Sequence, residues 1–517
     1  MNEKSSEKLY HGITHIDDEL VEAAQAKAAP RRRPWVKWCV MAACLCLVAA
    51  GAFALSQPHG SPADNTDRPV NENVPTPDDN RGDPNSLPTS NLSAFSVAEA
   101  VYPERVTFPL EENYVNANGE WDYDTWSADY NTWYEADEAR RQQAAGYAGT
   151  LDSFCADSVR QFLSGAGTEN RVYSPVNVYL AMAMVAEVTD GQSRQQILDL
   201  LGADSIETLR ARAAAVWDAN YQDDGATKLL LANSLWLSES VGYVPETMQA
   251  LAEHYFASAY RGKMGSAEYT QALRDWLNAQ TGGLLQEQAQ NVEPTPDTIL
   301  ALASTLYLKA GWTDEFYEAA TAPDVFHGPE GDVTCDFMHG VAEDGQLYRG
   351  DGFTAVCKHL SSGGAMWFLL PDEGSSPDKL LAGGQAVSFL LADKNSWADQ
   401  DHYIVHLNMP KFDVDSDMEL AEGMKVLGVI DAFDSDVSDF TPLTTEVDEL
   451  YISRIQHAAR VKVDEEGVEA AAFTVVSVEA NGIDLSDEVD FTLDRPFLFA
   501  VTGEENALLF TGVVNQP

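Results

Sequence analysis

The sequence predicts a protein of the α+β class, because helical patterns gather early in its main part and strand patterns gather late. Apolar residues recur at helical spacing from Leu151 to Phe162. A second helix should begin at Ser174-Pro175, an N-cap followed by a first-turn proline, and should continue through the apolar run over residues 176–188. Runs with strand character come later, at residues 229–237, 299–308, 366–370, 403–409, 461–463, 497–501 and 508–514.

Charge and composition limit the functions that need to be considered. The 517 residues include 82 acidic and 32 basic ones, which give a formal net charge of −50. DNA or RNA would be repelled by such a chain, so we exclude nucleic-acid binding as a working hypothesis. A hydrophobic content of 45% and an aromatic content of 10% supply ample material for a packed core.

The N-terminal region predicts a membrane anchor. Residues 38–55 are 18 uncharged and mostly apolar residues, close to the lower limit for a membrane-spanning helix. Because Arg31–Arg33 and Lys37 precede this run, the positive-inside rule predicts a cytoplasmic stub over residues 1–37 and an extracellular C-terminal part. Two alternatives stay open: a signal peptide cleaved after Ala52-Phe53-Ala54, which would give a secreted protein, and a lipid-modified Cys44.

Beyond the anchor, the composition divides the chain into three parts. Residues 56–93 are rich in Pro, Asn, Asp, Ser and Gly, which is typical of a disordered linker. Residues 94–147 combine acids with many Trp and Tyr residues, and we interpret them as an acidic aromatic extension packed on the main domain, which begins at 148 and ends at 517. Its three cysteines, an odd and sparse set, do not suggest a disulfide framework: Cys155, Cys335 and Cys357.

Enzyme motifs do not stand out in the sequence. The spacings that hold zinc, cradle phosphates or present a hydrolase nucleophile are missing (H-E-x-x-H, C-x-x-C, G-x-x-x-x-G-K-[ST], G-x-G-x-x-G and G-x-S-x-G). Acid pairs such as Asp372-Glu373 are most simply explained as a solvated face. We therefore predict that the protein is not an enzyme and needs no cofactor and no metal.

The most unusual segment covers residues 465–482. Its alternate residues Val468, Ala470, Ala472, Thr474, Val476 and Val478 are all small or apolar, which indicates a half-buried strand with small inward side chains. One interpretation is a hairpin that turns at Asn481-Gly482. The other is a strand that slips into an already formed sheet. An Ala triplet is a poor strand former, which argues against the hairpin, and small residues are what an inserting strand needs.

Several motifs in this part of the chain resemble those of the serpin family. Residues 465–472 (E-E-G-V-E-A-A-A) are similar to its hinge, residues 494–499 (D-R-P-F-L-F) and 509–517 to its C-terminal motifs. Residues 172–175, 305–312 and 409–412 (M-P-K-F) are similar to further family segments. The matches stand in family order over about residues 148–517, and the anchor suggests a bacterial, membrane-anchored member.

The resemblance implies a fold of three β-sheets with eight or nine helices and an exposed reactive loop. It implies suicide inhibition of proteases, in which the cleaved loop inserts into the main sheet. The implied hinge residues are Glu465, Glu466, Gly467, Val468, Glu469, Ala470, Ala471 and Ala472. The implied breach and shutter residues, which control sheet opening, are Trp312, Lys411, Ser174, Ser304 and His457. Ser304, Val468 and Phe473 depart from the family pattern, although no charge falls on the inserting face.

The same resemblance places the cleavage site. Counting fourteen residues on from Gly467 gives Asn481 as the scissile residue, with Ala480 and Gly482 as alternatives. Because no Lys or Arg occurs between Lys462 and Arg495, the loop offers nothing to a trypsin-like pocket. We expect a monomer that inhibits elastase-like serine proteases, with cysteine proteases as second candidates. A non-inhibitory serpin, acting as a binding or structural module, is the alternative.

Overall fold

The computed structural model describes residues 92–517, except 104–105, 107, 116–120, 149, 224–226, 469–486 and 504–505. The predicted stub and anchor, and the linker up to residue 91, lie outside the described residues. Among the helices of the described part, none is long and apolar enough to cross a membrane.

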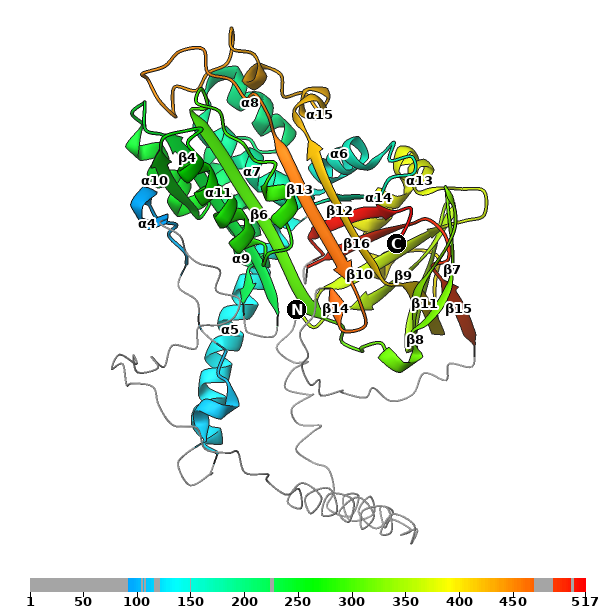
Figure 1. Ribbon diagram of the computed structural model, residues 1–517. Coiled ribbons are helices and arrows are strands. Elements are labelled where there is room, and N and C mark those ends of the chain that lie inside the picture. Colours follow the sequence, from blue (N-terminus) through cyan, green and yellow to red (C-terminus); the bar gives the residue numbers. More distant parts are fainter. Residues whose placement is uncertain are drawn as a thin grey trace, which may run out of the picture. The chain divides into compact units, whose positions relative to one another are not determined.

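One sheet, called the main sheet below, runs across the front of the molecule (Figure 1). Its strand order is β1-β5-β4-β6-β14-β13-β12, and the short β3 (Gln222–Asp223) pairs with β4. The strands are β1 (Ser96–Ala98), β5 (Ala257–Gly262), β4 (Lys228–Ser238), β6 (Leu300–Gly311), β14 (Gly467–Val468), β13 (Gln456–Val463) and β12 (Phe412–Glu419).

The other described strands form a second hydrogen-bonded network in the order β15-β11-β8-β9-β10-β16-β17-β2, with β7 paired to β8. They are β15 (Glu488–Thr492), β11 (Gln400–Pro410), β8 (Gly331–Gly350), β9 (Phe353–His359), β10 (Ala365–Pro371), β16 (Phe497–Thr502), β17 (Leu508–Val514), β2 (Arg171–Tyr173) and β7 (Ala322–Gly328). The resemblance implied three sheets. The described strands form two networks because β8 is one strand of 20 residues, which pairs with β7 and β11 and then with β9.

The helices surround these sheets. The described part contains twelve α-helices rather than the eight or nine implied, because five of them have seven residues or fewer. The longer ones are α5 (Tyr123–Ala148), α6 (Asp152–Leu163), α7 (Pro175–Val188), α8 (Gly191–Leu200), α9 (Ile206–Asn220), α10 (Pro245–His254) and α11 (Ala267–Gln280). The short ones are α4 (Leu92–Phe95), α12 (Gln286–Ala289), α13 (Pro377–Gly383), α14 (Gln385–Leu391) and α15 (Ala421–Val426).

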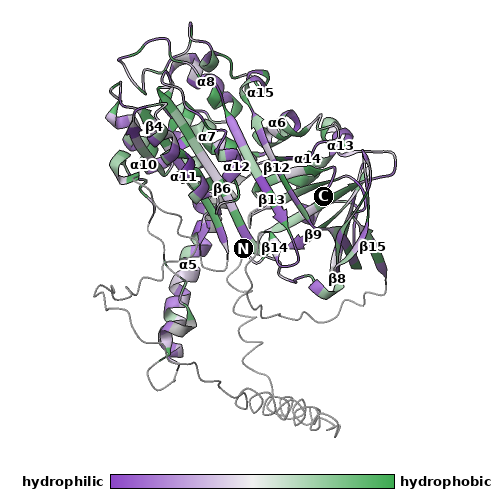
Figure 2. Cartoon of the chain, in the orientation of Figure 1, coloured by the Kyte–Doolittle hydropathy of each residue, from purple (hydrophilic) through white to green (hydrophobic). Residues whose placement is uncertain are grey.

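Helix α7 links the two sheets. It begins where the sequence predicted, because the Ser174 side chain accepts a hydrogen bond from the Asn177 N–H and Pro175 occupies the first turn. Nearly all its residues are buried, against β6 on one side and β17 on the other. Figure 2 shows the corresponding concentration of hydrophobic residues in α7 and the central strands. The core of the domain therefore lies between the main sheet and the second network.

The strands expected from the sequence are present within a few residues of their predicted limits. Strands β7, β8 and β9 were not predicted, and neither were β1, β2, β3, β5, β12 and β15. Over residues 322–359 most side chains of β7 are exposed, and β8 contains His, Asp and Gly residues in place of an apolar run. Their pairing to each other and to β11 fixes them as strands, which a local pattern cannot reveal.

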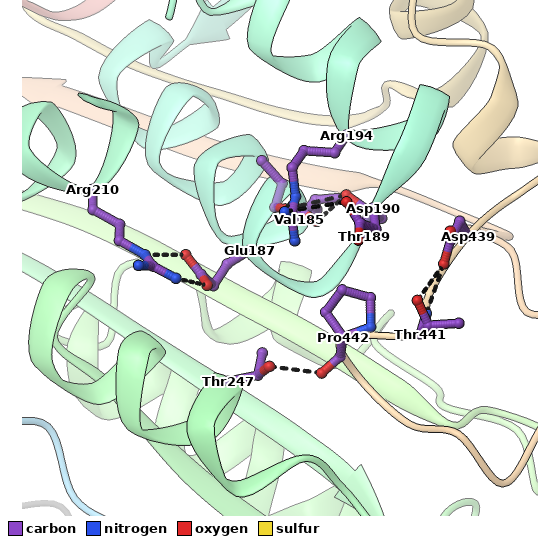
Figure 3. A network of polar contacts seen from close by, with 11 residues as sticks. Val185, Glu187, Thr189, Asp190, Arg194, Arg210, Thr247, Asp439, Thr441 and Pro442 are labelled. Carbon is purple, nitrogen blue, oxygen red and sulfur yellow. Dashed lines mark hydrogen bonds and ion pairs between the residues drawn. The ribbon is translucent and has the colours of Figure 1, made fainter. Parts of the chain in front are cut away.

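Polar contacts tie the chain together at the end of the main sheet where β13 begins (Figure 3). The buried Glu187 of α7 forms a bidentate ion pair with Arg210 of α9. The Thr247 hydroxyl of α10 donates to the Pro442 carbonyl at 2.7 Å, and the Asp190 N–H donates to the Asp439 carbonyl at 2.9 Å. Segment 439–446 thus joins α8 and α10.

Strand β1, Tyr102 and Arg140 connect the segment before residue 149 to the far edge of the main sheet and to α9. Strand β1 pairs antiparallel with β5, and the Tyr102 ring stacks on Trp217 at 5.3 Å. Along α5, Arg140 donates to the carbonyls of Asp218 and Ala219, at the C-terminus of α9. These contacts fix the base of α5 on the domain.

Candidate functional site: the hinge and the slot in the main sheet

The first hinge residues already belong to the main sheet. Strand β14 is only Gly467 and Val468, yet it lies between β6 and β13 and pairs antiparallel with both. Val468 stands opposite Ala310 of β6 and Val463 of β13, and its side chain is only 4% exposed. Gly467 fits here because a Cβ would lie 2.3 Å from the Ala310 carbonyl oxygen. The hinge therefore begins as an inserted strand.

Trp312 holds the chain that leads into β14. Its indole N–H donates to the Asp464 carbonyl at 2.9 Å, and its backbone N–H donates to the Glu466 carbonyl at the same distance. The Phe316 N–H donates to the Glu465 carbonyl at 3.1 Å. Three consecutive carbonyls before β14 are thus bound by the segment that follows β6, as the family role of Trp312 at the start of insertion would require.

The carboxylate of Glu465 has two partners. The Lys411 ammonium lies 2.6 Å from it, and the Thr321 hydroxyl donates to it at 2.7 Å. Burial alone would raise the pKa of Glu465, but these hydrogen bonds outweigh it and hold the pKa below its usual range. The same hydrogen bond raises the pKa of Lys411. The structure thus brings Lys411 and Glu465 together, and it adds Thr321, which no sequence motif indicated.

A second lysine, Lys358, lies beside Trp312. The Lys358 ammonium of β9 lies 4.5 Å from the Phe316 ring centroid and 5.6 Å from that of Trp312. Burial lowers its pKa to about 8, although nearby Asp314 opposes this. The aromatic faces partly replace the water that this charge has lost.

Below β14 the main sheet contains a slot. In the part of the chain that the structure describes, β14 is the only strand that joins β6 to β13, so the edges of both continue unpaired beyond Val468. A narrow cavity lies at this position and is lined by side chains from both strands and from the layers above and below: Leu306, Tyr307, Leu308, Ala459, Val461 and Phe510 among them. The slot is a ready position for an additional strand.

Ser174 and His457 meet at the far end of the slot. The Ser174 N–H donates to Nε2 of His457 at 3.1 Å, and the Ser174 hydroxyl donates to the Leu509 carbonyl at 2.6 Å. Because Nε2 accepts a hydrogen bond, the imidazole must be neutral. Burial lowers the pKa of His457 to about 4, in agreement with this bond.

Ser304 also belongs to this group. Its hydroxyl donates to the side-chain oxygen of Asn177, one turn along α7 from Ser174. The sequence singled out Ser304 as a departure from the family's usual Asn, and a serine still reaches α7 here. Asn177 itself was not predicted, although its place three residues after the N-cap Ser174 could have suggested it.

The outer face of the slot is bridged by the segment that follows α11. The Gln288 amide donates to Asp415 at 2.6 Å and the Asn291 amide to Asp417 at 3.0 Å, both on β12. Arg460 of β13 donates to the Leu284 carbonyl and is paired with Asp413. Residues 284–291 therefore link the α11 layer to the far side of the slot.

The remaining predicted site residues lie outside the described residues. These are the later hinge residues Glu469, Ala470, Ala471 and Ala472, and the scissile candidates Asn481, Ala480 and Gly482. Only the two ends of the loop are described, at Val468 and at Asp487, which precedes β15.

The described residues contain no group of three His, Cys, Asp or Glu side chains placed to hold a metal ion. The three described cysteines are poor nucleophiles. Burial raises the thiol pKa of Cys155 to about 12 and that of Cys357 to about 11, and Cys335 is shifted in the same direction. The chemistry of this part of the chain thus centres on strand pairing in the slot.

Among the described residues, the main sheet is thus closed at one end of the slot by the two hinge residues of β14, with the Trp312 and Lys411 contacts beside them and the Ser174 and His457 contacts at the other end. Residues 150–517 match the sequence model of the family described as Serpin (serine protease inhibitor). The chain belongs to the serpin family, whose members are generally protease inhibitors.

Similar proteins span the same region. The chain is 27% identical over 363 residues to Serpin-ZX of Arabidopsis thaliana, which covers 67% of this chain and 92% of that protein. It is 28% identical over 409 residues to Serpin-Z2B of Oryza sativa subsp. japonica, with 72% and 98% covered. The crystal structure of the thermophilic serpin Tengpin in its native state matches with a TM-score of 0.62 and 24% identity, over 72% of this chain and 94% of that one. AtSerpin1 of Arabidopsis in its native stressed conformation matches with a TM-score of 0.59 and 24% identity, over 73% and 98%. These likenesses confirm the serpin fold.

Proposed function

We propose that the protein is an inhibitory serpin whose reactive loop, once cut by a protease, inserts into the slot between β6 and β13. The observation that carries this proposal is β14, because Val468 already lies in the slot, is paired on both sides and is buried. The rest of the hinge needs only to continue the same strand.

The register of β14 can be continued residue by residue. Beyond the pairs Val468–Ala310 and Val468–Val463, Ala470 falls between Leu308 and Val461, and Ala472 between Leu306 and Ala459. These neighbours are buried and apolar. Small alanines fit between such large side chains without displacing them, which supports insertion of this segment.

Two further positions in the register are polar. Thr474 falls between Ser304 and His457, where its hydroxyl can join the hydrogen bonds of the shutter. On the outward face, Glu469 falls between Lys309 and Lys462. A carboxylate placed between two ammonium groups gains favourable charge interactions on insertion.

The chemistry follows from cutting a loop that is tethered at both ends. The protease's serine hydroxyl attacks the carbonyl of the scissile residue, and the ester that forms releases the amino group of the next residue. About 14 residues at roughly 3.3 Å each then add a strand some 46 Å long, which carries the bound protease away from its starting position. We propose that distortion of the protease during this movement prevents hydrolysis of the ester.

The loop composition supports elastase-like targets, with cysteine proteases as second candidates. Asn481, Ala480 and Gly482 are small or short side chains, and the loop offers no Lys or Arg. A shallow apolar pocket of the elastase type accepts Ala480, and an asparaginyl protease would accept Asn481, whereas a trypsin-like pocket needs a cation for its buried carboxylate.

The test is to incubate residues 57–517 with elastase-like, trypsin-like and cysteine proteases. An SDS-resistant complex with an elastase is expected, and mass spectrometry of the released C-terminal fragment should place the cut within residues 478–483. Cleavage without a complex would indicate a non-inhibitory member. Tight inhibition of trypsin with none of elastase would overturn the specificity.

We further propose that the protein is a bacterial, membrane-anchored serpin, with residues 38–55 as the anchor. Protease treatment of intact cells should then release the acidic domain while an N-terminal tag stays protected. A mature chain that begins near Leu55 and is found free in the medium would favour the secreted alternative.

A further inference from the structure

Helix α5 carries an unusual combination of side chains. Between Arg105 and Arg140 the sequence has no Lys or Arg, but many acidic and aromatic residues. The rings form a continuous series along the helix, with Trp126 stacked on Tyr130 at 5.1 Å and Phe108 packed edge-on against Trp133 at 4.9 Å. This part of the chain lies before residue 150, where the match to the serpin family begins.

Several of these side chains face solvent. Tyr123 is 56% exposed, Trp121 46% and Tyr134 44%, and the carboxylates of Asp124 and Glu135 are exposed as well. Residues 123–140 of α5 include no buried side chain. The helix is therefore not held as part of the core, and its rings and carboxylates are available to a partner.

The position of α5 relates this surface to the reactive loop. Arg140 binds the carbonyls of Asp218 and Ala219, at the end of α9. The chain then enters β4 at Lys228, which pairs with Lys309 of β6. Two residues further along β6, Gly311 pairs with the hinge residue Gly467. The anchoring point of α5 thus lies at the end of the main sheet where the hinge enters.

From this point α5 extends away from the domain. Its first 18 residues, up to Arg140, make roughly 27 Å of helix at about 1.5 Å per residue. In Figure 1 this part of α5 descends below the level of β14, the strand at which the reactive loop begins, whereas β15, at which the loop ends, lies on the other side of the molecule. A protease docked on that loop would approach the same end of the molecule.

We propose that the exposed face of α5 formed by Tyr123, Asp124, Tyr134 and Glu135, together with Trp121 just before the helix, is a secondary binding surface for the protease that attacks the reactive loop. The fitting partner is a protease with a lysine- and arginine-bearing surface beside its active site. This inference rests on the proposed function.

The chemistry of the surface selects such a partner. Cations bind both to carboxylates and to the faces of Trp and Tyr rings. Trp and Tyr are also the residues that most often dominate binding energy at protein interfaces. A second copy of this chain, with the same net charge of −50, would be repelled. The negative field of α5 would in addition steer a basic protease toward the loop.

The test compares two variants of residues 57–517 that lose equal charge and one tyrosine. The first is Asp124→Asn, Glu135→Gln and Tyr123→Ser on α5. The control is Asp436→Asn, Asp448→Asn and Tyr451→Ser near the other end of the main sheet, where Tyr451 is 54% exposed. Circular dichroism and melting temperature verify that both variants stay folded.

The measurement is the second-order rate of attack on the loop by two elastase-like proteases of opposite surface charge. We expect the α5 variant to slow the basic protease about tenfold, with a weaker salt dependence, and to leave the acidic protease unchanged. The control should leave both rates within about twofold of the parent.

Two results would overturn the proposal: an unchanged rate for the α5 variant, or an equal decrease for the control. A third result is that polylysine quenches tryptophan fluorescence while the rate of attack on the loop by the basic protease is unchanged in the α5 variant. That result would assign α5 to another basic partner and would also overturn the proposal. The ratio of covalent complex to cleaved chain is recorded separately. A loop that is cut at an α5-dependent rate without forming a complex would refute inhibition while supporting the secondary surface.

Discussion

The two ends of the slot between β6 and β13 are held in different ways. At the hinge end, the contacts are charged and partly exposed: Lys411 is 36% exposed and pairs with Glu465. At the shutter end, the contacts are neutral: the buried Ser174 donates to the buried His457, and the partly buried Ser304 donates to Asn177. Both ends rely on hydrogen bonds, but only the hinge end can exchange them with water at small cost.

The difference suggests a division of tasks. Contacts at the hinge end can be broken and remade as the first residues move, because water and neighbouring charges compensate them. At the shutter, a lost partner would leave a buried polar group unsatisfied, which costs about 1–3 kcal/mol. Under the proposed mechanism, we infer that the hinge end sets when insertion begins and that the shutter holds the far end of the slot until an arriving strand replaces its contacts.

The largest expected effect is at Val468. Val468→Arg would put a charge between Ala310 and Val463, in a position that is 4% exposed. Burying that charge without a partner costs several kcal/mol, so insertion should become slower than hydrolysis of the ester. We expect the loop to be cut as an ordinary substrate, with at least a hundredfold less covalent complex on gels, since about 2.7 kcal/mol corresponds to that ratio.

Val468→Thr is the matched control, because threonine keeps the branched shape and is a customary family residue at this position. It should form complex at close to the parent rate. An arginine variant that inhibits as well as the parent would show that insertion at the hinge end is not the mechanism.

The sequence alone predicted many of the residues at the two ends of the slot. Those that it could not predict were missed for physical reasons. Trp312, Lys411 and His457 were assigned by motif, and the structure places Lys411 beside Glu465 and His457 beside Ser174. Thr321 and Lys358 could not be found in this way, because they reach the hinge from strands and turns whose partners are distant in sequence. Likewise, the pairing of Gly467 and Val468 with two strands depends on the whole sheet.

The second effect is a pH dependence of the shutter. The pKa of His457 falls from 6.5 to about 4 on burial, so between these values the unfolded chain binds a proton that the folded chain does not. Stability is therefore complete above pH 6.5 and decreases as the pH falls to about 4, by about 3 kcal/mol. Urea unfolding at a series of pH values measures this.

His457→Gln identifies the source, since a glutamine oxygen can still accept from the Ser174 N–H but does not titrate. The variant should be less dependent on pH in this window, whereas His359→Gln at an exposed site should follow the parent. Parallel profiles for the parent and His457→Gln would assign the acid sensitivity elsewhere.

The third effect concerns the charged pair at the hinge end. Glu465→Gln leaves Lys411 without its carboxylate and should reduce stability by about 1 kcal/mol, because Lys411 is partly exposed and recovers some hydration. As the pKa of Glu465 is lowered, the parent should lose the same contribution when the pH falls below about 4.5. Glu466→Gln, the exposed neighbour, is the control and should change melting little. Equal losses in both variants would indicate a general charge effect.

The smallest expected effect tests the register of insertion. If Glu469 enters between Lys309 and Lys462, then Lys309→Ala removes one of its two cations. The ratio of cleaved chain to covalent complex should then increase about threefold, because a surface ion pair is worth under ~1 kcal/mol. Lys228→Ala is a close control, because Lys228 stands opposite Lys309 on β4, one strand further from the slot. The ratio of complex to cleaved chain, measured on gels with one protease, compares the two. A shift of the register by one residue would turn Glu469 to the inner face and remove the difference between the two variants. Equal ratios of complex to cleaved chain would therefore contradict this register. In that case β14 would define only the first two residues of the inserted strand.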